Sequence, residues 1–551
     1  MNLPEPQSRT YTALMGDIEK GQVKVPQFQR DFVWDLKRSA RLLDSIIKGY
    51  PIGTFILWKT KERFRMVRNI GGFVLPAPDE GDFTELVLDG QQRLTSLFAA
   101  MKGEKVTKDD GHVDDFSQIY VDLQATGDDP LIVIDIAGKD PKSIITLRDL
   151  LYGGLMQLAA YPQQYHGKLD EYRNRIASYN FSLISVKDAP LDVATEIFTR
   201  INTGGKELTL FEIMIAKTYD EKLKFDLAEK FDELIDNLEI IDYETISDAN
   251  VLQTIAIILE KECTRSKILS LKKQDFINTW EKAKDAIERA CEYFNGYYRI
   301  PVSGLLPYSP LVVPFAYFFF KHPDRPTGDK QKYLEDFFWR CALSGRYSSG
   351  VEGKLAQDIK RMDLILKDEL PKYEWGIDTS PEFIMQNGWF STGRSYIKAI
   401  LCIYAYHEPK SFVDNAKINI NNDWLKQANS KNYHHFFPKD FLKKKGEDEF
   451  KINHILNITI VDDFLNKRQI KTKAPSQYMA EFQMKNPKLI ATMKTHLIND
   501  LAKYGVWGDD YEKFFNERAQ AVSTELQNRV IKQEVDNKLQ PLLEDDTEAI
   551  T

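Results

Sequence analysis

Two neighbouring histidines, His434 and His435, have the side-chain chemistry that phosphodiester hydrolysis needs. They lie in the segment NYHHFFPK (432–439), and Asn457 and Asn466 follow downstream. An imidazole that titrates near pH 7 can activate water, and a second imidazole or a carboxamide can hold a divalent cation beside a phosphate. Successive side chains of a strand point to opposite faces, so the two histidines could share one site only if the strand twists there. The pattern indicates metal-assisted hydrolysis.

The surroundings of these histidines leave several interpretations open. No cysteine lies nearby, which argues against a zinc-stabilised knuckle. We expect His454 to be structural, with a DNA-phosphate contact as the alternative. The run Lys443–Lys445 is either a solvated helix end or a DNA contact. Lys439, Lys467 and Arg468 suit the phosphate backbone of DNA.

A second polar group, Asp89-Gly90-Gln91-Gln92-Arg93, lies at a predicted strand-to-helix junction. Free N–H groups at a helix start favour a phosphate, Gly90 permits close approach of a ligand, and Arg93 offers a fork of donors. The alternative is that Asp89 only caps the helix while Arg93 points into solvent. A P-loop is excluded, because Gly205-Lys206 is followed by Glu207 and lacks the upstream glycine.

Composition limits the class of protein. The 551 residues carry a net charge of −8, which argues against a polycationic DNA coat, although residues 431–475 hold ten Lys or Arg against six Asp or Glu. No apolar run approaches the roughly 20 residues of a membrane span, and the N-terminus lacks a secretory signal. The four cysteines are sparse and predicted to be buried thiols. We therefore expect a cytoplasmic protein without membrane contact.

The chain divides by pattern into three predicted domains, 1–220, 221–400 and 401–551. The first is α+β, with strand patterns at 54–58, 85–89, 119–123, 131–135 and 182–186 and a helix after the N-cap Asp35. The second is mainly helical, with the aromatic stretches 316–322 and 336–340 as core. The third ends in a predicted helix from about 510 to 537.

Four N-terminal motifs resemble the N-terminal domain of GmrSD-type (type IV) restriction enzymes. They are VPQFQRDFVW (25–34), YPIG (50–53), LDGQQRLTSL (88–97) and FTRINTGGKELTLFEI (198–213), and the resemblance covers about residues 8–220. It implies a ParB/sulfiredoxin-like fold that binds, and is expected to hydrolyse, a nucleoside triphosphate, with GTP, ATP, UTP and CTP not distinguished. The implied nucleotide site consists of Asp89, Gly90, Gln91, Gln92 and Arg93, with Gln29, Arg30 and Asn202 completing it.

Residues 400–530 resemble an HNH (ββα-metal) nuclease domain of the kind fused to GmrSD-type proteins, set within helices. By this resemblance His435 is the general base, His434 and Asn466 are ligands of Mg²⁺ or Mn²⁺, and Asn457 orients the loop that carries His435. Asn466 stands where many HNH nucleases have a final histidine.

These resemblances imply a nucleotide-regulated, metal-dependent endonuclease of phage defence. Its expected substrate is modified double-stranded DNA, with glucosylated hydroxymethylcytosine and phosphorothioate linkages as the alternatives, and a homodimer would cut both strands. Two other hypotheses stay open: a nucleotide-switched DNA-binding regulator with a vestigial nuclease domain, and an NTPase that acts on RNA.

Overall fold

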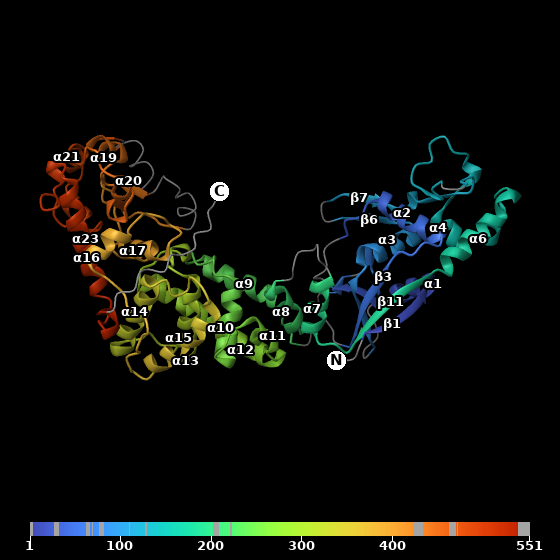
Figure 1. Cartoon of the computed structure of the whole chain (residues 1–551), viewed down its shortest axis with the longest axis horizontal. Coiled ribbons are helices and arrows are strands. Elements are labelled where there is room, and N and C mark those ends of the chain that lie inside the picture. The colour runs from blue at the N-terminus through green and yellow to red at the C-terminus, as the bar shows by residue number, and fades with distance from the viewer. Residues whose placement is uncertain are drawn as a thin grey trace. The chain divides into compact units, whose positions relative to one another are not determined.

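The protein was analysed as a computed structural model that divides into two compact units, Met1–Asp226 and Leu227–Thr551. Figure 1 draws the first unit in blue to blue-green and the second from green to red along the chain. The structure describes residues 4–26, 32–61, 67–68, 70–76, 82–108, 111–126, 129–201, 209–220, 223–421, 433–461, 470 and 472–537.

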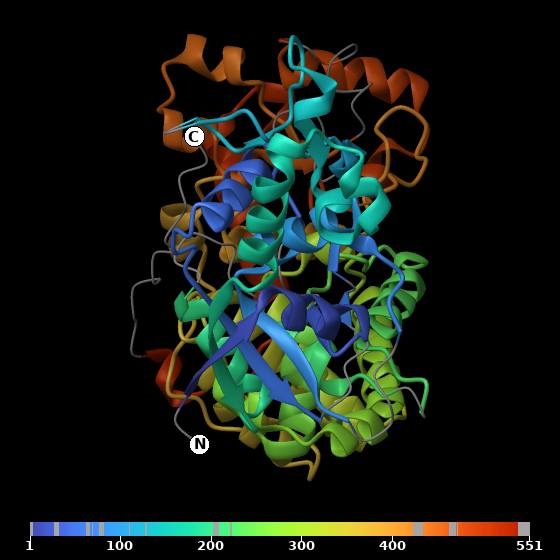
Figure 2. The same ribbon diagram turned by 90° about the vertical axis from the view of Figure 1, so that its right-hand side faces the viewer.

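The first unit is built on a mixed sheet with the strand order β1-β11-β3-β5-β2-β4. Its central strands β11 and β3 run parallel, and β3 pairs antiparallel with β5. The strands face the viewer in Figure 2. A smaller three-stranded sheet has the order β10-β8-β9, and β6 pairs with β7. The strands are β1 Glu5–Thr10, β2 Val23–Pro26, β3 Thr54–Thr60, β4 Val67–Arg68, β5 Thr84–Asp89, β6 Lys105–Thr107, β7 Val113–Asp115, β8 Tyr120–Asp122, β9 Ile132–Val133, β10 Ile144–Thr146 and β11 Asn180–Lys187.

Helices cover this sheet, and the α+β prediction for the region is confirmed. Helix α2 begins where expected, because the Asp35 carboxylate accepts a hydrogen bond from the Arg38 N–H at 2.7 Å. Helix α3 is buried along most of its length, so its apolar side chains form part of the unit's core. The helices are α1 Tyr11–Glu19, α2 Leu36–Ile47, α3 Gln91–Lys102, α4 Leu147–Tyr152, α5 Leu155–Ala159, α6 His166–Ala177, α7 Leu191–Ile201 and α8 Leu210–Thr218.

The second unit begins as a bundle of helices, as the amphipathic pattern predicts. The aromatic stretches of α13 and α14 are buried, which confirms their prediction as core. All four cysteines are free and buried, and burial raises the pKa of the Cys263 thiol to about 12. The helices of this part are α9 Leu227–Glu239, α10 Asp248–Glu260, α11 Arg265–Ser270, α12 Lys273–Gly296, α13 Val312–Lys321, α14 Gly328–Leu343, α15 Val351–Ile365, α16 Pro381–Asn387 and α17 Ser395–Tyr406.

The second unit continues with a short antiparallel strand pair and further helices. Strand β12 holds the two adjacent histidines and pairs with β13. Residues 462–469, where the predicted metal ligand Asn466 lies, are outside the described residues. The elements are β12 Tyr433–His435, α19 Lys439–Lys445, α20 Glu449–Ile452, β13 Ile458–Ile460, α21 Pro475–Lys485, α22 Leu489–Lys494 and α23 Tyr511–Gln527.

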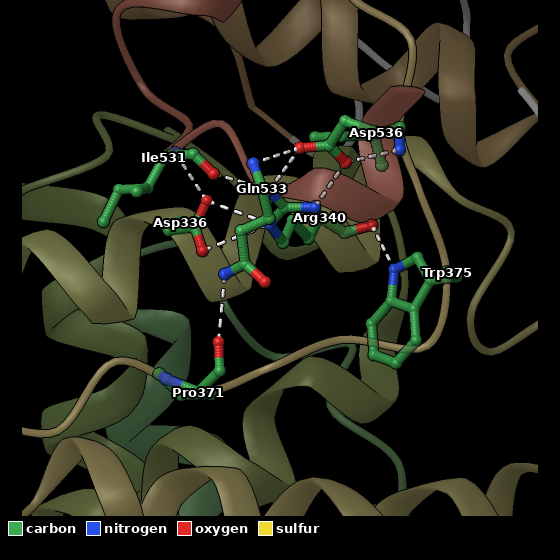
Figure 3. Close-up of polar contacts among 8 residues, drawn as sticks. Asp336, Arg340, Pro371, Trp375, Ile531, Gln533 and Asp536 are labelled. Carbon is green, nitrogen blue, oxygen red and sulfur yellow. Dashed lines mark hydrogen bonds and ion pairs between the residues drawn. The ribbon is translucent and has the colours of Figure 1, made fainter. Parts of the chain in front are cut away.

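The predicted helix from about 510 to 537 is wrong in its last ten residues. Helix α23 ends at Gln527, and a separate 3-10 turn spans Glu534–Asn537. A buried ion cluster explains the break (Figure 3). Arg340 of α14 donates both terminal nitrogens to the Asp536 carboxylate at 2.8 Å, and its Nε lies 3.1 Å from Asp336. Since Arg340 and Asp336 are fully buried, the chain leaves the helix to bring Asp536 to them.

In the part of the chain that the structure describes, none of the helices is both long and apolar enough to cross a bilayer.

Candidate functional site

Gly90 makes the turn between strand β5 and helix α3. Its φ of +93° lies in the left-handed region, and a Cβ built there would lie 2.4 Å from the Phe55 ring. A larger residue therefore has neither the backbone conformation nor the space. The first turn of α3 is brought close to strand β3 in this way.

Arg93 turns back toward strand β3 instead of pointing into solvent. Its Nη1 donates to the Ile52 carbonyl at 2.6 Å, and its Nη2 donates to the Thr54 carbonyl at 2.9 Å. The guanidinium also lies over the Phe55 ring, 4.9 Å from the centroid, and 3.3 Å from the Asp89 carboxylate. Burial lowers the pKa of Arg93, and the Asp89 charge opposes that shift. The N-cap is Gly90, so the alternative of a capping Asp89 and a solvated Arg93 is not the arrangement found.

The two glutamines of the motif are both buried but are used differently. Gln92 Oε1 accepts from the backbone N–H groups of Val33 and Trp34, at 2.9 and 3.3 Å, and so ties the end of the first motif to the third. Gln91 is 8% exposed, and its Oε1 has no hydrogen-bond partner among the described residues. A buried unpaired oxygen costs on the order of 1–3 kcal/mol, so this atom is suited to a ligand donor. Gln29, Arg30 and Asn202 lie outside the described residues.

In the second unit, strand β12 places His434 and His435 on opposite sides. His434 is 2% exposed and contacts the rings of Phe412 and Tyr478 edge-on, with centroids 6.3 and 6.1 Å away. His435 is part-buried on the other side, and its Nε2 lies 3.1 Å from Asn453 Oδ1. The strand pairing sets this alternation, since His434 faces Thr459 and His435 faces Ile458 in the register.

Asn457 fixes the backbone that follows the histidines. Its Oδ1 accepts from the Phe437 N–H at 2.8 Å, and its Nδ2 donates to the carbonyls of Phe437 and Ile452. Its own carbonyl accepts from the Phe436 N–H at 2.7 Å. The amide is fully buried, so these bonds hold the turn after β12 rigidly.

The electrostatic environment keeps His435 neutral at pH 7. Burial, together with the positive charge of Lys439, lowers the pKa of His435 to about 4, and the Asn453 bond opposes this shift. Lys439 is exposed at the first position of α19. A neutral imidazole can accept a proton, but a pKa of about 4 makes His435 a weaker base than the imidazole titrating near pH 7 that the sequence predicts.

His454 is a packing residue, as predicted. It is fully buried, its Nδ1 accepts from the Leu456 N–H at 3.1 Å, and its ring packs against Phe515 at 4.7 Å. A Cβ at Gly388 would lie 2.1 Å from the His454 ring. The contact with Gly388 leaves no room for any larger side chain.

Among the described residues, no group of three or more His, Cys, Asp or Glu side chains is placed to hold a metal ion. His434 is enclosed by aromatic rings, and Asn466, the other predicted ligand, lies outside the described residues, as do Lys467 and Arg468. The described side chains alone therefore do not form a metal site.

Comparison with known families identifies the first unit. Residues 11–219 match the family described as the GmrSD restriction endonuclease N-terminal domain, which includes the motif around Arg93. The chain carries a GmrSD N-terminal domain. It is also similar to the uncharacterized protein MJ0686 of Methanocaldococcus jannaschii, with 25% identity over 84% of each chain.

Some supporting residues of both units could not be found from the sequence. In the GmrSD N-terminal domain, the carbonyls of Ile52 and Thr54 hold Arg93, and backbone acceptors have no sequence signature. In the second unit, Asn453 contacts His435, and the buried Arg518 of α23 donates to the Ile458 carbonyl at 2.9 Å. A lone asparagine and a helical arginine carry no pattern that points to these partners.

Proposed function

We propose that this chain is a nucleotide-regulated, divalent-metal-dependent DNA endonuclease of phage defence that cleaves modified foreign DNA. The observation that carries the proposal is the match of residues 11–219 to a domain of GmrSD restriction endonucleases. The C-terminal part contributes the candidate chemistry, a neutral imidazole at His435 next to the exposed cation Lys439.

The nucleoside triphosphate belongs to the first unit in this proposal. The N–H groups at the start of α3 and the Gln91 Oε1 would contact it, with Gln29, Arg30 and Asn202 as further contacts. Arg93 is held by two carbonyls, so its first role is to keep the turns at Gly53 and Gly90 in place beside the phosphates.

Cleavage belongs to the second unit. His435 takes a proton from a water whose oxygen forms the new bond to phosphorus, while the bond from phosphorus to the 3′-oxygen breaks. Asn457 keeps the turn after β12 in place, and Lys439, with Lys467 and Arg468, binds the phosphate backbone. A bound Mg²⁺ or Mn²⁺ would neutralise charge on the phosphate. His434 and Asn466 are its proposed protein ligands, and His434 could serve only if its ring turned away from the rings of Phe412 and Tyr478 that enclose it. A homodimer would supply one such centre for each DNA strand.

A substrate panel tests the proposal. Purified protein is incubated with plain, glucosylated or phosphorothioate-containing DNA, with Mg²⁺ or Mn²⁺, and with each nucleoside triphosphate in turn. We expect cleavage of a modified DNA that depends on metal and responds to nucleotide. His435→Ala should lower the rate about 10²–10⁴-fold, whereas the exposed His166→Ala should cleave like wild type.

The panel also decides between the alternatives. Nucleotide-dependent DNA binding without cleavage of any DNA would favour the regulator with a vestigial nuclease domain. Nucleotide turnover stimulated by RNA alone would favour the third hypothesis. A His435→Ala variant that cleaves normally would remove His435 as the base.

A further inference from the structure

We propose that Asn453 is a positioning residue for His435: it fixes the ring so that Nε2 carries the hydrogen and Nδ1 presents its lone pair. The inference rests on the proposed function only for what Nδ1 then does, which is to accept the proton from water. The tautomer itself is a property of the folded chain.

The first step concerns the orientation of the Asn453 amide. Its Nδ2 lies 3.3 Å from the carbonyl oxygen of Phe390. A carbonyl oxygen can only accept, so the amide nitrogen must face Phe390. The Oδ1 atom is then the one that lies 3.1 Å from His435 Nε2.

The second step assigns the hydrogen on the imidazole. Because Asn453 Oδ1 can only accept, His435 Nε2 must donate. A neutral imidazole carries one N–H, so the hydrogen on Nε2 leaves Nδ1 unprotonated. The Phe390 carbonyl thus determines, through Asn453, which ring nitrogen is basic.

The third step is that Asn453 is itself held rigidly. Its backbone N–H donates to the Glu449 carbonyl at 3.0 Å, and its carbonyl accepts from the Phe390 N–H at 2.9 Å. A further backbone hydrogen bond, from the Ile455 N–H to the Gly388 carbonyl at 2.8 Å, also joins the segment around Asn453 to the segment around Phe390. The side chain of Asn453 therefore approaches His435 from a fixed backbone, as a group that orients a catalytic imidazole must.

The first test reads the tautomer directly. Nitrogen NMR of the full chain, labelled with ¹⁵N at histidine and assigned with a His435→Gln variant, is recorded at pH 7.5. We expect a protonated Nε2 and an unprotonated Nδ1 at His435. A hydrogen on Nδ1 in the wild type would overturn the inference, whatever the chain does to DNA.

The second test uses variants and cleavage kinetics. Asn453→Ala should lower kcat about 10–100-fold with little change in KM and give a mixture of His435 tautomers. Asn453→Asp keeps an acceptor oxygen toward His435 but loses the donor to the Phe390 carbonyl, so it should retain the Nε2–H tautomer and recover kcat in part. Asn387→Ala, which removes a bond to the Phe383 carbonyl in the neighbouring α16, should leave kcat unchanged.

The outcomes separate the two proposals. If Asn453→Ala keeps the wild-type kcat, Asn453 has no positioning role. If wild type cleaves no DNA, the proposed function fails, and the NMR spectrum alone still decides the tautomer. If Asn453→Ala does not fold, the wild-type spectrum and Asn453→Asp carry the test.

Discussion

The two candidate sites hold their key polar side chains in different ways. In the first unit, the Arg93 guanidinium is fixed by the backbone carbonyls of Ile52 and Thr54 and by the face of Phe55. In the second, the His435 imidazole meets the amide of Asn453, a side chain that a point mutation can remove. Substitution of Ile52 or Thr54 leaves the backbone carbonyls that hold Arg93 in place. Substitution of Asn453, in contrast, removes the group that orients His435. The first arrangement favours a stable binding site and the second a tunable catalytic one.

The largest expected loss of stability comes from a substitution at Gly388, which packs against the buried ring of His454. Gly388→Ala would place a methyl group 2.1 Å from the buried His454 ring, so the second unit should lose about 3 kcal/mol or more of its free energy of unfolding. Urea unfolding measures this loss. Gly353→Ala in α15 is the matched control, because no neighbouring side chain of the described residues lies within 4 Å of a Cβ built there, and it should stabilise by about 0.5–1 kcal/mol. Equal stabilities of the two variants would contradict the described packing.

The second prediction tests the hydrogen bonds from Arg93 to the backbone carbonyls of Ile52 and Thr54. Arg93→Met leaves the carbonyls of Ile52 and Thr54 without their donors, which should destabilise the first unit by about 2–4 kcal/mol. Lys102→Met, on the same helix, removes an ion pair to Glu19 near the surface and a cation–π contact with Phe98, and should change stability by under about 1 kcal/mol. Thermal unfolding compares them. An Arg93→Met protein as stable as Lys102→Met would show that the carbonyl bonds contribute little.

A third prediction concerns the pH dependence of stability. Burial lowers the pKa of His454 to about 4 and that of His496 to about 3, so at pH 5 these imidazoles stay neutral in the folded state but take up protons when unfolded. The free energy of unfolding of the second unit should therefore fall as the pH drops from about 6.5 toward 4, by roughly 1–3 kcal/mol for each group. Urea titrations at pH 7.5, 6, 5 and 4 measure it. A flat profile across this range would contradict buried neutral histidines.

The smallest effect is expected at Lys439. Because this side chain is exposed, Lys439→Ala should change stability by under about 0.5 kcal/mol. The logarithm of the DNA association constant falls linearly with the logarithm of the salt concentration. If Lys439 contacts a phosphate, the magnitude of this slope should be about 0.9 smaller in Lys439→Ala than in wild type. Lys485→Ala, an exposed lysine at the end of α21, serves as the control and should keep the slope. Identical slopes for both variants would remove Lys439 from the DNA interface.

Local signals in the sequence predicted the elements of the fold well. The cap at Asp35, the junction at Gly90 and the aromatic core of α13 and α14 all follow from residue type and spacing. The end of α23 could not be predicted, since Asp536 leaves the helix for Arg340, 196 residues away in the sequence. Helix propensity is a local quantity, and a buried charge elsewhere in the unit outweighs it.

The sequence predicted the motifs of both candidate sites but not the contacts that their side chains make. The pattern around Arg93 marked a site, yet only the structure shows that the guanidinium bonds to strand β3 instead of facing solvent. The adjacent histidines marked a second site, but the partner of His435 is an asparagine eighteen residues downstream. The alternation of His434 and His435 across the strand was predictable, because a strand repeats every two residues.

The cluster of Asp336, Arg340 and Asp536 has a consequence for biosynthesis. A ribosome that has just added Arg340 must add 196 further residues before Asp536 exists, which takes roughly 10–40 s at ordinary elongation rates. During that interval the nascent helix α14 holds its guanidinium without this partner. Since Asp336 is already in place, the bundle around α14 can enclose the guanidinium with one carboxylate beside it, and the second carboxylate joins only after Asp536 has emerged.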